Sequence, residues 1–219
     1  MINYDLTIRM KIFRLKCEVK GLLKLGVLAS GRGTNLQSII DHIKEGKLNA
    51  DVKVIISDNR DSGALQRAEK EGISHYFINP EDFSSRKDYE KALINKLKEY
   101  EVELVVLAGF MRILSPYFIN KYRQQIMNIH PSLLPAFRGL NAHQQALEYG
   151  VKVSGCTVHF VDEGMDTGPI ILQEVVPVKV EDTVETLSQR ILEKEHEIYP
   201  EAIQLYEEGK HNKFLLDNE

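Results

Sequence analysis

The feature that most constrains the fold of this sequence is a series of short apolar runs separated by amphipathic stretches. The runs are rich in valine and isoleucine, as expected for strands buried inside a sheet. They are LGVLAS (25–30), VKVIIS (52–57), HYFIN (75–79), VELVVLAG (102–109) and IMNIH (126–130). Because strands that alternate with helices form parallel sheets, we predict an α/β fold with a mostly parallel central sheet and helices on both faces.

Two of the intervening stretches carry the spacing of amphipathic helices. In the first, apolar residues recur at i, i+3, i+4 and i+7, and they are Leu36, Ile39, Ile40 and Ile43. The second follows Ser84 and Ser85, two residues that suit the N-cap position. Its apolar side consists of Tyr89, Leu93, Leu97 and Tyr100. Both stretches are therefore predicted to be helices that cover the sheet.

The C-terminal part of the chain has a different pattern. Two strand-like runs, VSGCTVHFVDEG (153–164) and PIILQEVVPV (169–178), are joined by a segment rich in glycine and aspartate. This pattern predicts mixed strands in the C-terminal half of the sheet. A long helix is predicted from about Thr183, with a kink at Pro200 because proline cannot donate the helical hydrogen bond.

Residues 1–22 form an N-terminal extension before the first apolar run. Polar and apolar residues alternate there with one change of phase, which predicts one or two extra strands. An extra strand can pair with a sheet edge or with another chain, so the extension is compatible with a homodimer. Residues 23–219 are interpreted as a single domain.

The composition excludes several classes of protein. The net charge of −4 gives no basic field that would attract a nucleic acid. Cys17 and Cys156 lie far apart and the histidines lack metal-ligand spacing, so neither a disulfide framework nor a metal site is predicted. Neither a long apolar span nor a signal peptide is recognisable. We expect a soluble, cytoplasmic protein that binds small molecules, with no nucleic-acid or membrane partner.

A glycine turn, SGRGTNL (30–36), lies between the first predicted strand and the first predicted helix. The dinucleotide-binding motif fails because Leu36 replaces its third glycine, and no Gly-Lys pair of a P-loop follows. Backbone N–H groups at such a turn can still bind an anion, so Gly33, Thr34 and Asn35 are candidates for a phosphate site. The alternative is a helix cap that follows a tight turn and binds nothing.

The segment NIHPSLLP (128–135) places two polar side chains before a rigid apolar loop. If the preceding run is a strand, Asn128 and His130 point to the same face and Pro131 ends the strand. Open α/β sheets bind ligands at the carboxyl ends of their strands. An amide donor beside an imidazole suits a developing oxyanion. The alternative is a buried pair that is satisfied by backbone groups.

Carboxylates stand out at two further places. DEGMDTGP (162–169) carries three carboxylates and two glycines between strands, but its spacing does not match a calcium loop. It is either a solvated turn or a way to direct one carboxylate toward a histidine and favour its charged form. Glu195 falls on the apolar side of the C-terminal helix, where a carboxylate either completes a buried network or binds a ligand.

Four motifs, in this order along the chain, resemble those of the phosphoribosylglycinamide formyltransferase family. They are LASGRGTNLQSII (28–40), LAGFMRILSP (107–116), NIHPSLLPAFRG (128–139) and GCTVHFVDEGMDTGPIILQ (155–173). The resemblance, which runs from about Leu25 to about Leu205, implies a Rossmann-like formyltransferase fold. It implies a mononucleotide-binding half at about 23–122 and a folate-binding half at about 123–219.

The resemblance also implies an activity and a set of site residues. The activity is transfer of a formyl group from the co-substrate 10-formyltetrahydrofolate to the amine of glycinamide ribonucleotide, in de novo purine biosynthesis and without a metal. The implied catalytic residues are Asn128, His130 and Asp166. The implied ribonucleotide-binding residues are Gly33, Thr34, Asn35, Pro131 and Glu195. The implied folate-binding residues are Arg86, Met111, Arg112, Ile113, Leu114 and Asn128.

In the implied mechanism, protonated His130 and the amide of Asn128 stabilise the oxyanion that forms when the amine attacks the formyl carbon. Asp166 favours the protonated imidazole and relays the proton of the amine. The sequence departs from the family pattern at Asn141, where many members carry a histidine.

Three other functions compete with this interpretation. Methionyl-tRNA formyltransferase has a similar catalytic motif, but it is longer and binds a nucleic acid, which the acidic charge of this chain disfavours. Formyltetrahydrofolate deformylase carries an N-terminal regulatory domain, for which residues 1–22 are too few. A non-catalytic nucleotide-binding module would not need three converging polar clusters.

Overall fold

The computed structural model describes residues 21–210, so the predicted N-terminal extension lies almost wholly outside the described residues. The strands are β1 (Leu23–Leu28), β2 (Ala50–Ser57), β3 (His75–Phe77), β4 (Leu104–Leu107), β5 (Ile126–His130), β6 (Val153–Phe160) and β7 (Ile170–Pro177). The helices are α2 (Thr34–Lys44), α3 (Gly63–Lys70), the short 3-10 helix η1 (Pro80–Asp82), α4 (Arg86–Glu99), α5 (Pro116–Ile119), α6 (Ala142–Tyr149) and α7 (Val184–Glu207).

Within residues 21–210, the seven strands belong to one sheet in the order β3-β2-β1-β4-β5-β6-β7. The pairs from β3 to β5 are parallel, and the pairs β5–β6 and β6–β7 are antiparallel. This arrangement confirms the predicted parallel sheet with mixed strands in the C-terminal half. The chain winds outward from β1 to β3 and then returns to place β4 on the other side of β1. The sheet therefore has its switch point between β1 and β4, where open α/β sheets bind ligands.

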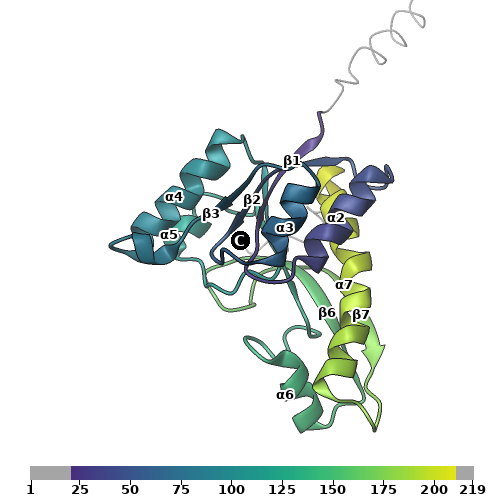
Figure 1. Cartoon of the computed structure of the whole chain (residues 1–219). Helices are drawn as coiled ribbons and strands as arrows, with labels where there is room; N and C mark the ends of the chain where they lie inside the picture. The colour runs from purple at the N-terminus through teal and green to yellow at the C-terminus, as the bar shows by residue number, and fades with distance from the viewer. Residues whose placement is uncertain (1–20, 211–219) are drawn as a thin grey trace, which may run out of the picture.

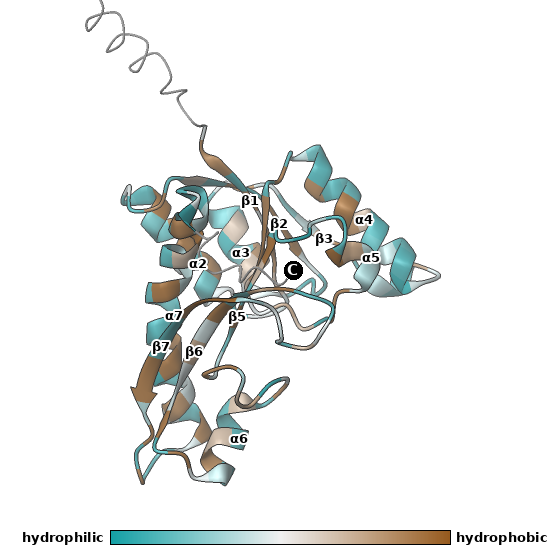
Figure 2. Ribbon diagram, turned by 180° about the vertical axis from the view of Figure 1, so that it is seen from behind, coloured by the Kyte–Doolittle hydropathy of each residue, from teal (hydrophilic) through white to brown (hydrophobic). Residues whose placement is uncertain are grey.

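Helices cover both faces of the sheet, as predicted (Figure 1). On one face, apolar residues of α2, α3 and α7 share a core with the strands. On the other face, α4 and α5 pack against a second set of strand residues. Figure 2 shows the consequence for hydropathy, with apolar strands inside and polar residues on the outer sides of the helices. Among residues 21–210, no helix has both the length and the apolar character that a membrane crossing requires.

The strand predicted at 75–79 is present at His75–Phe77, but the prediction that it is buried was wrong. β3 has three residues, and among the described strands it lies at the edge of the sheet, where it pairs with β2. His75 is exposed, and Tyr76 and Phe77 are half-buried, because an edge strand is covered on fewer sides than a central strand.

The long C-terminal helix α7 begins where the sequence predicts. Thr183 is its N-cap and forms a capping box with Thr186. The helix continues through Pro200 as one element, although proline has no N–H for the carbonyl four residues earlier. That carbonyl belongs to His196, and the hydroxyl of Ser38 in α2 donates to it at 2.6 Å. A side chain of the neighbouring helix thus replaces the missing helical hydrogen bond.

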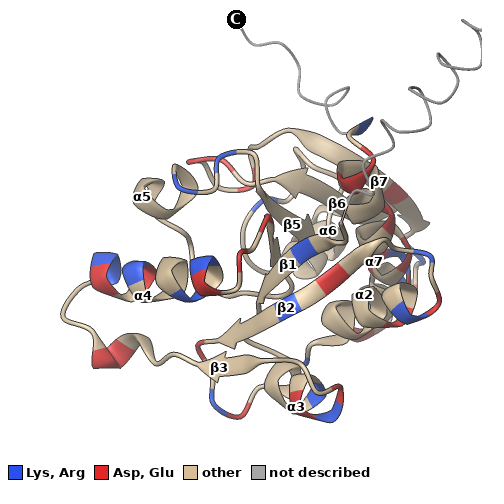
Figure 3. Cartoon of the chain, turned by 90° about the horizontal axis from the view of Figure 1, so that it is seen from above, with Lys and Arg blue, Asp and Glu red and all other residues tan. Residues whose placement is uncertain are grey.

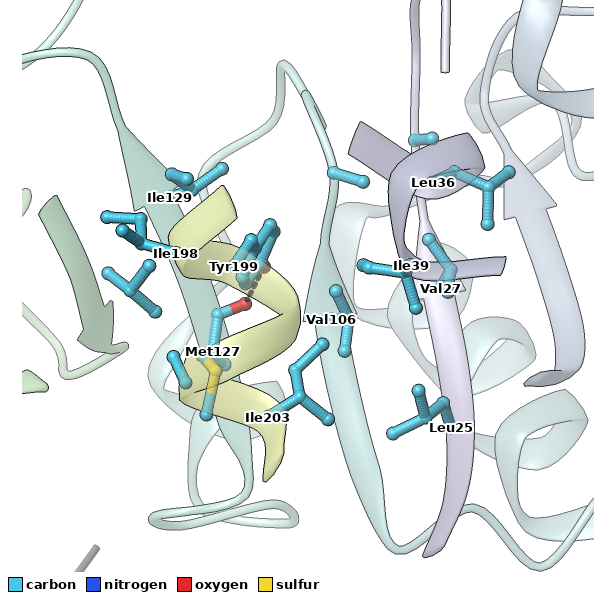
Figure 4. Close-up of a cluster of buried hydrophobic side chains, with 14 of the residues drawn as sticks. Leu25, Val27, Leu36, Ile39, Val106, Met127, Ile129, Ile198, Tyr199 and Ile203 are labelled. Carbon is cyan, nitrogen blue, oxygen red and sulfur yellow. Dashed lines mark hydrogen bonds between the residues drawn. The ribbon is translucent and has the colours of Figure 1, made fainter. Parts of the chain in front are cut away.

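Tyr199 fixes α7 to the centre of the sheet. Its ring is fully buried, and its hydroxyl lies 2.9 Å from the carbonyl oxygens of both Leu107 and Met127. Figure 4 shows this ring among the apolar side chains of β1, β4, β5, α2 and α7. Burial raises the pKa of the phenol well above its ordinary value, so it remains a neutral donor. The bonds hold α7 against the two strands that end at the predicted site.

Candidate active site

The three predicted catalytic residues lie close together at the carboxyl end of β5. Asn128 and His130 share one face of β5, and Asp166 comes from the loop between β6 and β7. His130 Nδ1 lies 3.4 Å from Asp166 Oδ2. Asp166 has a left-handed backbone (φ 52°), and its Oδ2 accepts a hydrogen bond of 2.8 Å from the N–H of Gly139. The structure therefore brings together the carboxylate and the imidazole that the resemblance pairs.

The contacts of His130 determine which form of its ring is satisfied. Nε2 lies 2.8 Å from the carbonyl oxygen of Phe137, which can only accept, so this nitrogen carries a proton. Nδ1 faces the carboxylate of Asp166, which also accepts. The doubly protonated ring is the form that satisfies both neighbours. Both ring nitrogens face acceptors in the protein. His130 can therefore donate to a substrate oxygen only when one nitrogen leaves its protein acceptor for that oxygen.

His159 is a functional candidate that the sequence reasoning missed. It is buried on β6 directly opposite Asn128, and its Nε2 lies 3.7 Å from Asp166 Oδ1. Its Nδ1 lies 2.8 Å from the carbonyl of Phe160 and must therefore carry the proton. Nε2 of the neutral ring then accepts a hydrogen bond of 3.2 Å from Asn128 Nδ2. This bond fixes the orientation of the amide and leaves its second N–H available.

Replacing His159 should change how stability depends on pH. Burial lowers the pKa of this histidine, against the opposing effects of the Phe160 carbonyl and the Asp166 charge. In the unfolded chain, His159 therefore takes up a proton as the pH falls through 6.5, the ordinary pKa of histidine. In the folded chain it takes up this proton only at a lower pH. The free energy of unfolding should fall as the pH decreases from 6.5, until the folded ring also protonates.

We expect His159→Gln to flatten this part of the profile. Urea unfolding measured between about pH 7.5 and pH 5 tests the slope. The matched control is His75→Gln, which removes an exposed histidine of β3. A slope in His159→Gln equal to that of the unsubstituted protein would show that His159 takes up protons equally in both states.

The loop that carries Asp166 uses its three carboxylates differently. Asp162 Oδ1 accepts from the N–H of Gly164 at 3.0 Å and from the hydroxyl of Thr167 at 2.6 Å, so it shapes the turn. Glu163 is exposed, and its Oε1 lies 3.4 Å from the amide of Asn120. Asp166 faces the histidines. Asp166 is thus the carboxylate directed toward a histidine, and Asp162 is the carboxylate that builds the turn. Each of the two interpretations of this segment therefore applies to a different residue.

The glycine turn after β1 presents the N-terminus of α2. Gly33 is the N-cap residue with φ 71°, and no side chain among residues 21–210 caps this end of the helix. Asn35 Nδ2 donates to Glu195 Oε2 at 2.7 Å. Burial raises the pKa of the Glu195 carboxyl, partly offset by the Asn35 hydrogen bond and by the charge of Arg32. The structure therefore joins the turn to the carboxylate that interrupts the apolar side of α7.

The predicted folate-binding residues of the β4–α5 segment line a cavity of about 600 Å³. The lining includes Arg86, Met111, Arg112, Ile113 and Leu114, together with residues of α4 and of the segment before it. Met111 and Ile113, two residues apart on this lining, are 68% and 66% exposed and provide apolar surface for a ligand. Asn128, which the resemblance also assigns to folate, does not belong to the lining residues.

The predicted residues thus form three groups, which follow the carboxyl ends of the adjacent strands β1, β4 and β5. Ser30 links two of the groups, because its N–H donates to the Gly109 carbonyl and its hydroxyl accepts from the N–H of Met111 at 2.9 Å.

Two further residues that the sequence singles out lie close to β5 and α6. Pro131 directly follows β5, and Asn141 adopts a left-handed conformation (φ 58°) at the start of α6, which asparagine tolerates. Within residues 21–210, no group of three or more His, Cys, Asp or Glu side chains is arranged to hold a metal ion.

Comparison with known proteins places this chain in a family. The formyl transferase family matches residues 23–203. Phosphoribosylglycinamide formyltransferase of Bacillus subtilis is 43% identical over 180 residues, which cover 82% of this chain and 92% of that protein. The human trifunctional purine biosynthetic protein adenosine-3 is 49% identical over 186 residues, but this chain spans only 18% of its length and covers a similarly small part of the other trifunctional relatives.

Solved structures agree with the sequence matches. Glycinamide ribonucleotide transformylase 1 of Symbiobacterium toebii superimposes with a TM-score of 0.85 at 52% identity, covering 86% of this chain and 89% of that chain. Phosphoribosylglycinamide formyltransferase of Bacillus halodurans gives a TM-score of 0.82 at 42% identity, covering 88% and 99%. The matches and the shared fold agree with the resemblance of the four motifs, and the chain belongs to the phosphoribosylglycinamide formyltransferase family.

Proposed function

We propose that this protein transfers the formyl group of 10-formyltetrahydrofolate to the amine of glycinamide ribonucleotide. The products are formylglycinamide ribonucleotide and tetrahydrofolate, and the reaction belongs to de novo purine biosynthesis in the cytoplasm. The observation that carries the proposal is the convergence of three residue groups at the ends of β1, β4 and β5. They comprise an uncapped helix start beside a buried carboxylate, a cavity with exposed apolar residues, and a pair of polar side chains beside Asp166.

In the proposed reaction, the amine nitrogen forms a bond to the formyl carbon and the carbonyl oxygen becomes negatively charged. The free N–H of the Asn128 amide, oriented by His159, donates to this oxygen. Protonated His130 donates a second hydrogen bond to this oxygen, and Asp166 beside it accepts the proton of the amine and passes it onward. Cleavage of the bond to N10 of the folate then releases tetrahydrofolate, whose nitrogen takes up a proton. Placing the two substrates side by side supplies the proximity that a reaction between two molecules needs.

A turnover assay with each acceptor tests the proposal. Purified protein is supplied with 10-formyltetrahydrofolate, and tetrahydrofolate formation is followed with and without glycinamide ribonucleotide. We expect tetrahydrofolate to form only with the ribonucleotide and in equal amount to its formylated product. If tetrahydrofolate forms at the same rate without the ribonucleotide, water is the acceptor of the formyl group and the protein is a deformylase. Formylation of methionyl-tRNA under the same conditions would identify the other competing activity.

The glycine turn is proposed to hold the phosphate of the ribonucleotide. A Cβ added to Gly33 would lie 2.7 Å from the Cα of Ala64 in α3, in a backbone conformation that only glycine adopts easily. We therefore expect Gly33→Val to displace the N–H groups that bind the anion. Loss of one charge-assisted hydrogen bond costs about 1.5–3 kcal/mol, which raises the KM for the ribonucleotide roughly tenfold or more.

Steady-state kinetics with each substrate varied in turn measures this effect. Gly46→Val is the matched control, because Gly46 has almost the same φ (70°) but no atom within 4 Å of an added Cβ. We expect the KM for the folate to change little in both variants. Equal increases of both KM values in Gly33→Val would show that the turn supports the fold rather than the ribonucleotide.

A further inference from the structure

The segment between β4 and α5 forms one wall of the 600 Å³ cavity although much of it is exposed. Met111 and Ile113 are largely exposed, whereas Ala108 at the start of the segment and Leu114 near its end are buried, Leu114 in the core under α4 and α5. A segment with few buried apolar contacts is ordered mainly by its hydrogen bonds. The groups that hold its main chain therefore decide the shape of the wall.

A buried carboxylate on α4 holds the C-terminal end of this segment. Glu90 is 2% exposed, and its Oε1 accepts a hydrogen bond of 2.7 Å from the backbone N–H of Ser115. Its Oε2 accepts a short hydrogen bond from the Ser115 hydroxyl. Burial of a carboxylate is costly unless hydrogen bonds and opposite charge compensate it. Glu90 obtains the hydrogen bonds from the segment itself.

The opposite charge comes from Arg86, one helical turn earlier on α4. Its Nε donates to Glu90 Oε1 at 3.2 Å, and its Nη2 donates to the carbonyl oxygen of Ile113. The pair thus holds the main chain on both sides of Leu114, at the carbonyl of Ile113 and at the N–H of Ser115. In the other ion pairs on α4, Lys91–Asp88 and Lys96–Glu99, the carboxylates are far more exposed than Glu90. Figure 3 shows charged residues spread along the helix.

We propose that Glu90 is a positioning residue of the folate site, which shapes the cavity wall through Arg86 and Ser115. The inference rests on the proposed function, since it takes the 600 Å³ cavity as the folate site. Glu90 itself does not touch the reacting groups, so its loss should affect folate binding and leave the chemistry intact. Arg86 has two roles in this proposal. It holds the main chain at the Ile113 carbonyl, and it makes the contact with folate that the resemblance implies.

The test is Glu90→Gln, a nearly isosteric change that removes the charge and replaces one acceptor oxygen with an NH₂ group. We expect the KM for 10-formyltetrahydrofolate to rise about tenfold, the equivalent of one such interaction. The kcat at saturating folate and the KM for glycinamide ribonucleotide should stay within about twofold of the unsubstituted protein. Glu99→Gln is the matched control, because it neutralises an exposed carboxylate of the same helix.

Ser115→Ala provides a second variant that removes only the hydroxyl donor. If Glu90 acts through Ser115, the folate effects of Glu90→Gln and Ser115→Ala should be non-additive in the double variant. An unchanged folate KM, or equal increases of both KM values, in Glu90→Gln would overturn the inference; if that variant does not fold, the same outcomes in Ser115→Ala decide. Calorimetric binding of tetrahydrofolate tests the same effect without turnover. It therefore separates a failure of this inference from a failure of the proposed activity.

Discussion

Asp166→Asn should lower kcat at least about 10²-fold, the lower end of what a general acid–base group contributes. The change is nearly isosteric, and an amide oxygen can still accept the hydrogen bond from the N–H of Gly139. The fold and both binding regions should therefore survive. What disappears is the negative charge beside His130 Nδ1, and with it the partner of the protonated ring and the acceptor for the proton of the amine.

The loss should fall on kcat rather than on KM, because the charge serves the transition state more than the bound substrates. Steady-state kinetics with both substrates varied provides the measurement. Glu163→Gln, in the same loop but exposed, controls for the loss of one negative charge. If Asp166→Asn retains kcat and raises only KM, Asp166 is a binding residue and the proposed catalytic role is wrong.

Asn128→Ala should lower kcat by about 10²–10³-fold, the effect of removing one donor from an oxyanion site. The structure gives this amide a special position, because one N–H is held by His159 and the other has no acceptor among the described residues. An amide held in this way needs no reorganisation when the charge develops. Its removal should therefore affect the transition state more than substrate binding.

The same kinetic assay measures this effect, and Asn120→Ala is a suitable control because it removes an exposed amide that contacts Glu163 in the loop of Asp166. Binding of tetrahydrofolate to Asn128→Ala should remain within about threefold of the unsubstituted protein. A variant that retains most of its kcat would place the oxyanion donor elsewhere, with His130 as the next candidate.

Local patterns in the sequence predicted most of the fold. Valine-rich and isoleucine-rich runs identify the buried strands β1, β2, β4 and β5, and Ser85 and Thr183 identify the starts of α4 and α7. These features depend on residues close together in the chain. The exposure of β3 could not be predicted, because it depends on which strand lies beside it in the sheet.

In the candidate site too, some residues are placed by local sequence patterns and others only by tertiary contacts. Asn128 and His130 share a face of one strand, so alternation along the sequence already places them together. His159 joins them only through the antiparallel register of β5 and β6, which pairs it with Asn128 across 31 positions of the chain. Glu90 is similar: on the sequence it reads as one more charged residue of a helix, and only the tertiary contact with Ser115 distinguishes it.

The hydrogen bond from Ser38 to the His196 carbonyl has a consequence for which sequence changes this chain tolerates. While residue 200 is proline, loss of the Ser38 hydroxyl leaves that carbonyl without its protein donor. Once residue 200 is any other amino acid, α7 can supply its own N–H and Ser38 becomes dispensable for this purpose. The two positions are therefore epistatic. A lineage can lose the serine safely only after it has lost the proline, so the order of substitutions matters although the residues lie 162 positions apart.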